Sequence, residues 1–122
     1  MSGSKRIFVV EDDLHIRESL TEVLEIEGFN VFSAVNGQEA LDILRSGEKA
    51  DLILLDLMMP IKDGFQFKAE QEVDPLISHI PVIIMSANGN MSAKKELGVV
   101  KEFLKKPIDL DALLSTINRY LN

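Results

Sequence analysis

The sequence contains no cysteine, and this absence excludes two kinds of site. Without cysteine the chain can form neither a disulfide framework nor a thiolate metal site, which fits a reducing compartment and an expected cytoplasmic location. Long apolar runs are also missing, since Leu52–Leu55 and Pro81–Met85 are far too short to span a bilayer. The N-terminus lacks the apolar core of a signal peptide. We therefore expect no membrane contact.

Positive charge is in short supply. Lysine and arginine total 13 against 20 aspartates and glutamates, which gives a formal net charge of −7. This balance disfavours contact with phosphate backbones, so we expect no direct nucleic-acid binding. A length of 122 residues with 46% apolar content suits one domain over residues 1–122. Residues 1–4 are expected to be disordered or left over from cloning.

Short apolar runs alternate with amphipathic stretches along the chain. Strands are expected at Ile7–Val10, Val31–Ala34, Leu52–Leu55, Val82–Met85 and Phe103–Leu104. Helices are expected over 14–27, around Ala40–Leu44, around Phe65–Val73, over 91–97 and from Leu110 to Leu121. Strands that are apolar on both faces and alternate with helices predict a doubly wound five-stranded parallel sheet, of order 2-1-3-4-5, flanked by five helices. In the third helix, Phe65, Ala69 and Val73 form the expected buried stripe.

Three acids should meet at one end of this sheet. Glu11 and Asp12 follow the first strand and Asp56 follows the third, and these two strands are neighbours in the predicted order. Oxygen ligands without histidine or cysteine indicate a hard cation, and Mg²⁺ fits best because no EF-hand spacing is present. Asp13 is expected to cap the following helix instead.

Two further polar side chains are expected at the same edge of the sheet. Ser86 follows the fourth strand and Lys106 follows the fifth. Beside a bound cation, Asp56 can act as a nucleophile that forms an aspartyl phosphate. Lys106 then provides a positive charge for phosphoryl oxygens, and the Ser86 hydroxyl provides a hydrogen-bond donor. Phosphoryl transfer depends mainly on such positioning and charge neutralisation.

These residues stand in four motifs. They are VVEDD (9–13), LLDLMMPIKDG (54–64), VIIMSA (82–87) and FLKKPID (103–109). In this order they make the chain resemble the receiver domain of bacterial two-component response regulators, of the chemotaxis-regulator type, from about Lys5 to Leu121. The resemblance implies a flavodoxin-like fold.

The resemblance also implies roles for residues around the acids. Asp56 matches the phosphoacceptor, Asp12 the acid that contacts Mg²⁺ directly, and Glu11 the acid that acts through water. Met58 matches the residue whose backbone carbonyl binds the metal.

Other implied roles concern the response to phosphorylation. Ser86 matches the switch hydroxyl, Phe103 the switch aromatic, and Lys106 the lysine before a proline, where the family tends to have a cis peptide bond. The implied protein is a phosphorylation-activated switch rather than an enzyme, and it promotes its own phosphorylation and dephosphorylation. The implied phosphoryl donor is a sensor histidine kinase or a phosphotransfer protein, with an unnamed protein partner downstream. A homodimer would use the face of the fourth helix, fifth strand and fifth helix.

Several alternatives stay open. A pseudo-receiver would bind partners without phosphorylation, although all the site residues are present. An aspartyl-phosphate phosphatase would need an acid two residues after the nucleophile, where Met58 stands. A nucleotide- or flavin-binding protein would need a glycine- or hydroxyl-rich loop after the first strand, and that loop is acidic. The segment 88–101 departs from the family's spacing, so its conformation is open, as are the kinase, the output and any further domains.

Overall fold

The computed structural model describes residues 4–87 and 97–121. The strands are β1 (Arg6–Val10), β2 (Asn30–Ala34), β3 (Leu52–Asp56), β4 (Val82–Ser86) and β5 (Glu102–Lys105). The helices of the described residues are α1 (Leu14–Ile26), α2 (Gly37–Arg45), α3 (Gly64–Glu72) and α5 (Leu110–Leu121). The helix predicted over 91–97 falls almost wholly outside them. No helix in the described ranges has both the length and the apolar character to cross a bilayer.

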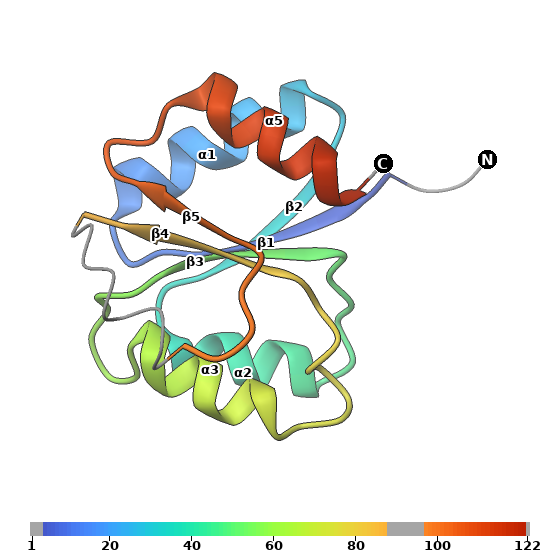
Figure 1. Cartoon of the computed structure of the whole chain (residues 1–122), viewed down its shortest axis with the longest axis vertical. Helices are drawn as coiled ribbons and strands as arrows, with labels where there is room; N and C mark the ends of the chain where they lie inside the picture. Colours follow the sequence, from blue (N-terminus) through green and yellow to red (C-terminus); the bar gives the residue numbers. More distant parts are fainter. Residues whose placement is uncertain (1–3, 88–96, 122) are drawn as a thin grey trace.

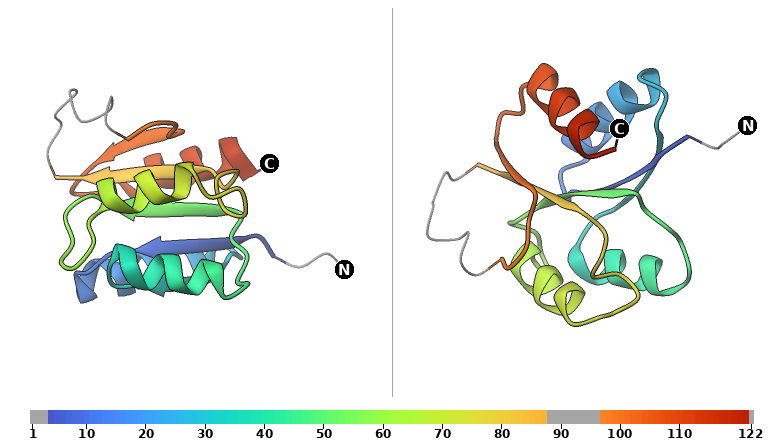
Figure 2. Two further views of the ribbon diagram at one scale, coloured as in Figure 1. Left: turned by 90° about the horizontal axis from the view of Figure 1, so that it is seen from below. Right: turned by 45° about the vertical axis from the view of Figure 1, so that its right-hand side comes forward.

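The strands form one parallel sheet in the predicted order, β2-β1-β3-β4-β5. Helices α1 and α5 cover one face of the sheet, and α2 and α3 cover the other (Figures 1 and 2). The chain begins inside the sheet at β1, continues to β2 at one edge, and then returns to the other side of β1 as β3. Strands β1 and β3 therefore lie side by side, although β2 and α2 separate them in sequence. This arrangement places the segments that follow β1 and β3 next to each other.

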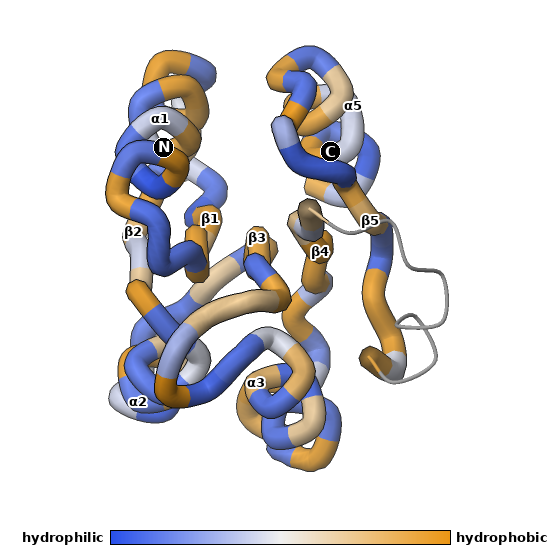
Figure 3. The backbone as a smooth tube through the Cα atoms, turned by 90° about the vertical axis from the view of Figure 1, so that its left-hand side faces the viewer, coloured by the Kyte–Doolittle hydropathy of each residue, from blue (hydrophilic) through white to orange (hydrophobic). Residues whose placement is uncertain are grey.

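Alternate residues of each central strand enter two separate hydrophobic cores. Phe8 and Val10 of β1 join the core under α2 and α3, whereas Ile7 and Val9 join the core under α1 and α5. All four side chains are fully buried. The central strands accordingly run as continuous hydrophobic segments through the middle of the molecule (Figure 3). Strands of a parallel sheet are buried on both faces, so they are apolar at consecutive positions, and the apolar runs in the sequence predicted the sheet for this reason.

The predicted boundaries of α1 are confirmed. Asp13 precedes the helix, and its side chain accepts a hydrogen bond from the Ile16 N–H at 3.0 Å. At the other end Gly28 has φ +96°, the left-handed conformation that glycine adopts most readily after a helix.

The predicted buried stripe of α3 is wrong at two of its three positions, because of the three only Phe65 packs against the core, where it is partly buried. Ala69 is exposed and Val73, which follows the helix, is 80% exposed. The inward residues are instead Gly64, Phe67, Lys68 and Gln71. Gly64 fixes this rotation, because a Cβ there would lie 2.6 Å from the Asp56 carbonyl oxygen, so the helix starts in direct contact with the β3 end. Residues three, four and seven positions later then face inward, although two of them are polar.

Candidate functional site

The three predicted acids lie together at the carboxyl ends of β1 and β3. Glu11, Asp12 and Asp56 each offer a carboxylate oxygen, and these three oxygens lie within 4.8 Å of one another. Glu11 is fully buried and Asp56 is 5% exposed, whereas Asp12 faces solvent. The site is therefore a buried carboxylate pair with a third acid at its solvent side.

Lys106 links the two buried acids. Its Nζ lies 2.7 Å from Glu11 Oε1 and 3.2 Å from Asp56 Oδ1. Its backbone N–H donates to the Ser86 carbonyl at 2.8 Å, so the end of β4 fixes the main chain of this lysine. The Lys106–Pro107 peptide bond is cis, as the resemblance implied.

Burial dominates the electrostatics of the acids. It raises the pKa of Glu11 and of Asp56, and the hydrogen bonds and charge of Lys106 oppose that rise. Burial alone would lower the pKa of Lys106, but its contacts with Glu11 and Asp56 outweigh it and raise that pKa overall. The lysine therefore stays charged at neutral pH, and the buried carboxylates depend on that charge.

The donor set fits a hard divalent cation. All the candidate ligand atoms are carboxylate oxygens, which favours Mg²⁺ over softer metals. Three carboxylates and one ammonium leave a formal charge of −2 at the site, which equals the charge that a divalent ion neutralises. Asp12, the exposed acid, is open to solvent for an incoming ion.

Asp13 is not part of the carboxylate group. Its side chain caps α1 as predicted, and the hydrogen bond from the Ile16 N–H lowers the pKa of this carboxyl. The Asp13 backbone N–H donates to Glu11 Oε2 at 3.1 Å. Asp13 thus starts the helix with its side chain and holds Glu11 with its main chain.

The loop between β3 and α3 packs closely against the phosphoacceptor candidate. The Met58 backbone N–H lowers the pKa of the Asp56 carboxyl, after the larger effects of burial and Lys106. The Met58 side chain is 73% exposed, and the metal-binding role of its carbonyl stays a prediction. The Gly64 N–H donates to the Leu57 carbonyl at 2.9 Å, and Asp63 and Gln66 form a capping box at the start of α3.

Sequence reasoning missed what Gly64 does. The Asp63-Gly64 pair indicated only a loop, whereas the glycine allows α3 to begin in contact with the Asp56 backbone. The sequence signal for this role is the short separation between Asp56 and Gly64, because the chain must turn back tightly between the end of β3 and the start of α3.

Ser86 lies on β4, the neighbour of β3, and Phe103 lies on β5 at the edge of the sheet. Ser86 is the last residue of β4 and is partly buried. Phe103 lies in β5 and is partly buried against the core under α2 and α3. Their predicted switch roles stay predictions.

Comparisons with known proteins agree with this geometry. The family model for the response regulator receiver domain matches residues 7–118. The chain is 38% identical over 121 residues to sporulation initiation phosphotransferase F of Bacillus subtilis, covering 97% of this chain and 94% of that protein. It spans about half the length of several curated transcriptional regulatory proteins that it also matches.

Solved structures share the fold. Chemotaxis protein CheY4 of Vibrio cholerae superposes with a TM-score of 0.89 at 26% identity, covering 98% of this chain and all of that one. The response regulator TrrA of Thermotoga maritima, solved in complex with Mg²⁺-BeF, gives a TM-score of 0.86 at 32% identity, with 96% and 99% covered.

Proposed function

Because the chain belongs to the family of response regulator receiver domains, we propose that it is a phosphorylation-activated switch with Asp56 as its phosphoacceptor. The observation that carries the proposal is the shared contact of Lys106 with Glu11 and Asp56, beside a third carboxylate at the solvent side. The contact places a positive charge at a buried nucleophile, which is what transfer of an anionic phosphoryl group needs.

The reaction proposed is transfer from a phosphohistidine of a sensor kinase or phosphotransfer protein. A carboxylate oxygen of Asp56 forms a bond to phosphorus. The bond between phosphorus and the donor imidazole nitrogen breaks, and its electron pair stays on that nitrogen. Lys106 moves its ammonium toward the phosphoryl oxygens, and the Met58 N–H favours the charged form of the Asp56 carboxyl, whose pKa it lowers.

Mg²⁺, held by Glu11, Asp12 and Asp56 with the Met58 carbonyl, would supply positive charge to the phosphoryl oxygens. The relay proposed after transfer runs through the Ser86 hydroxyl and the Phe103 ring. Homodimer formation through the fourth-helix face stays a prediction, because part of that face lies outside the described residues.

The test is incubation with Mg²⁺ and acetyl phosphate, followed by intact-mass measurement. We expect one phosphoryl adduct, lost in Asp56→Asn and lost without Mg²⁺. Asp51→Asn is the matched control, because Asp51 lies just before the other end of the same strand and should leave the adduct unchanged. No adduct on the parent protein would refute the proposal and favour a pseudo-receiver that binds partners without phosphorylation.

A further inference from the structure

Arg17 makes an unexpected contact with the acidic loop. It lies near the start of α1, is partly buried, and is the one arginine or lysine of that helix. Its Nη1 lies 2.9 Å from the Glu11 carbonyl oxygen and 3.3 Å from the Asp12 carbonyl oxygen. Among residues 4–87 and 97–121 it pairs with no carboxylate. The guanidinium is thus directed at the main chain of two candidate metal ligands.

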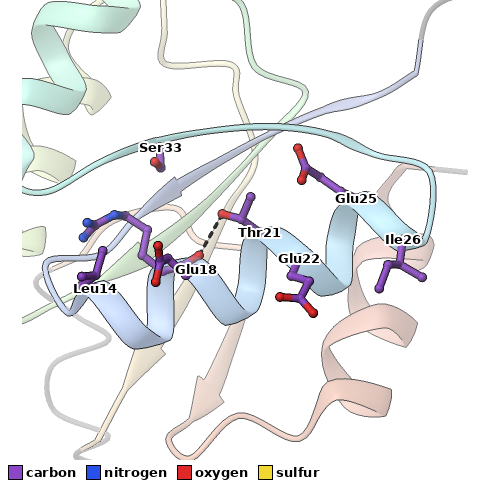
Figure 4. A pocket seen from close by; sticks show the side chains of 8 residues that line it. Leu14, Glu18, Thr21, Glu22, Glu25, Ile26 and Ser33 are labelled. Carbon is purple, nitrogen blue, oxygen red and sulfur yellow. Dashed lines mark hydrogen bonds between the residues drawn. The ribbon is translucent and has the colours of Figure 1, made fainter.

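Both main-chain polar groups of Arg17 form hydrogen bonds. Its N–H donates to the Asp13 carbonyl at 2.9 Å, and its carbonyl accepts from the Thr21 hydroxyl at 2.8 Å. The second bond is drawn in Figure 4, which shows the open flank of α1 where Leu14, Glu18 and Thr21 line a shallow pocket beside β2. The guanidinium therefore extends from a fixed piece of helix.

The three acids differ in how their carboxylates are held. The Glu11 carboxylate accepts from Lys106 and from the Asp13 N–H, and the Asp56 carboxylate forms an ion pair with Lys106 at 3.2 Å. For the Asp12 carboxylate, no such hydrogen bond is present in the described part of the chain. The contact that the structure shows for Asp12 is instead on its main chain, where the carbonyl accepts from Arg17 at 3.3 Å.

We propose that Arg17 is a positioning residue for the metal site: it holds the carbonyls of Glu11 and Asp12 so that the Asp12 carboxylate is directed at the cation. This inference rests on the proposed function, since it assumes that Mg²⁺ binds at the three acids. Groups that hydrogen-bond to metal ligands without contacting the metal commonly control metal affinity.

Charge and position predict opposite effects for this residue. A cation near the site repels Mg²⁺, so if charge alone mattered, removing Arg17 would strengthen Mg²⁺ binding. If Arg17 positions Asp12, removing it would weaken binding because the carboxylate loses its fixed direction. The sign of the change in affinity therefore identifies the role.

The experiment is calorimetric titration of the full chain with MgCl₂, using Arg17→Gln and the control Arg45→Gln. Arg45 lies on α2 in exposed ion pairs with Glu70 and Asp74, so its substitution changes the net charge equally without touching the loop. We expect Arg17→Gln to bind Mg²⁺ about tenfold more weakly, at unchanged stoichiometry. Arg45→Gln should stay within about twofold of the parent.

A partly unfolded variant would lower the number of sites and leave the dissociation constant unchanged, so the two causes are separable. Should Arg17→Gln fail to fold, Arg17→Lys keeps the charge but loses the planar fork, and we expect it to bind more weakly as well. Equal or tighter Mg²⁺ binding by the folded variant would overturn the inference and leave the proposed function intact. Absence of 1:1 binding by the parent would overturn the inference together with the magnesium part of the proposed function.

Discussion

Truncating Glu72, an exposed acid at the end of α3, is expected to destabilise the fold more than its surface position suggests. Its partner Lys68 is only 2% exposed. The Lys68 ammonium donates to Gln71 Oε1 at 2.7 Å, to the Val99 carbonyl at 2.8 Å and to Glu72 Oε1 at 3.1 Å. Glu72 is the sole carboxylate among these acceptors, so it supplies the compensating charge for a buried cation.

Glu72 also fixes the chain that leads into β5. Its Oε1 accepts a hydrogen bond from the Val99 N–H at 2.8 Å, and Lys68 donates to the Val99 carbonyl. Both main-chain polar groups of Val99 are therefore bound by this ion pair. Gly98 allows this approach, because its φ is +68° and a Cβ there would lie 2.7 Å from the Glu72 carboxylate. The pair therefore connects α3 to a segment far along the sequence.

The magnitude follows from the difference in burial. Removing one partner of a fully buried ion pair costs about 3–5 kcal/mol. The Glu72 side chain is 34% exposed and Lys68 retains two neutral acceptors, so we discount the cost of Glu72→Ala to about 2–3 kcal/mol. Glu70→Ala is the matched control: its side chain is 38% exposed, and its partner Lys62 is 18% exposed, so neither member of that ion pair is as buried as Lys68. That change should cost no more than about 1 kcal/mol.

Urea unfolding of the two variants measures this difference, and a third variant tests the cause. Lys68→Met in the Glu72→Ala background removes the uncompensated charge and keeps an unbranched side chain, so it should recover about 1–2 kcal/mol. Equal losses for Glu72→Ala and Glu70→Ala, or no recovery by Lys68→Met, would refute the reasoning.

The same pair predicts a dependence on pH. The Val99 N–H and Lys68 lower the pKa of Glu72 below its ordinary 4.5. A lowered folded-state pKa gives stability that is complete above the unfolded value and is lost as pH falls through the folded value. The gap in stability between the parent and Glu72→Ala should therefore shrink as pH falls below about 4.5.

Two backbone positions give further predictions. Ile61 has φ +70° and is 81% exposed, so Ile61→Asn should raise stability by about 1 kcal/mol in urea unfolding, since asparagine tolerates this conformation and little burial is lost. Val73→Asn, at an equally exposed valine with φ −100°, should give no gain, and a similar gain there would exclude backbone strain as the cause. Gly37→Ala should cost about 1–3 kcal/mol despite alanine's better helix propensity, because its Cβ would lie 2.7 Å from the Lys62 carbonyl oxygen. A stabilised Gly37→Ala would show that this loop shifts freely.

The sheet and the meeting of the acids could be predicted because both depend on local pattern and topology. Strands with apolar residues on both faces must lie inside the sheet, and parallel strands bring their carboxyl ends to one edge. Glu11 and Asp56 follow two such strands, so their proximity needs no knowledge of side-chain packing. Register and order settle it.

The face of α3 could not be predicted, because the rule that buried means apolar fails there. Lys68 and Gln71 point inward, and each has hydrogen-bond partners outside the helix: the Val99 carbonyl for the lysine, and the carbonyls of Ile77 and Ile80 for the glutamine. A polar residue can be buried when such partners exist. Their positions depend on the tertiary fold, so helical periodicity alone selected the wrong stripe.

The site shows the same division between topology and local contact. The motifs identified the acids and Lys106, whose types follow from the charge that each must carry. They did not identify Arg17, because an arginine on a helix with many glutamates looks like part of a solvated charged face. Its guanidinium instead contacts two neutral carbonyls, whereas both buried acids pair with Lys106. A second cation paired directly with the carboxylates would reduce the formal charge of the site from −2 to −1, and the charge of −2 is what suits the site to a divalent ion. By binding main-chain oxygens, Arg17 fixes the loop and leaves that negative charge on the carboxylates.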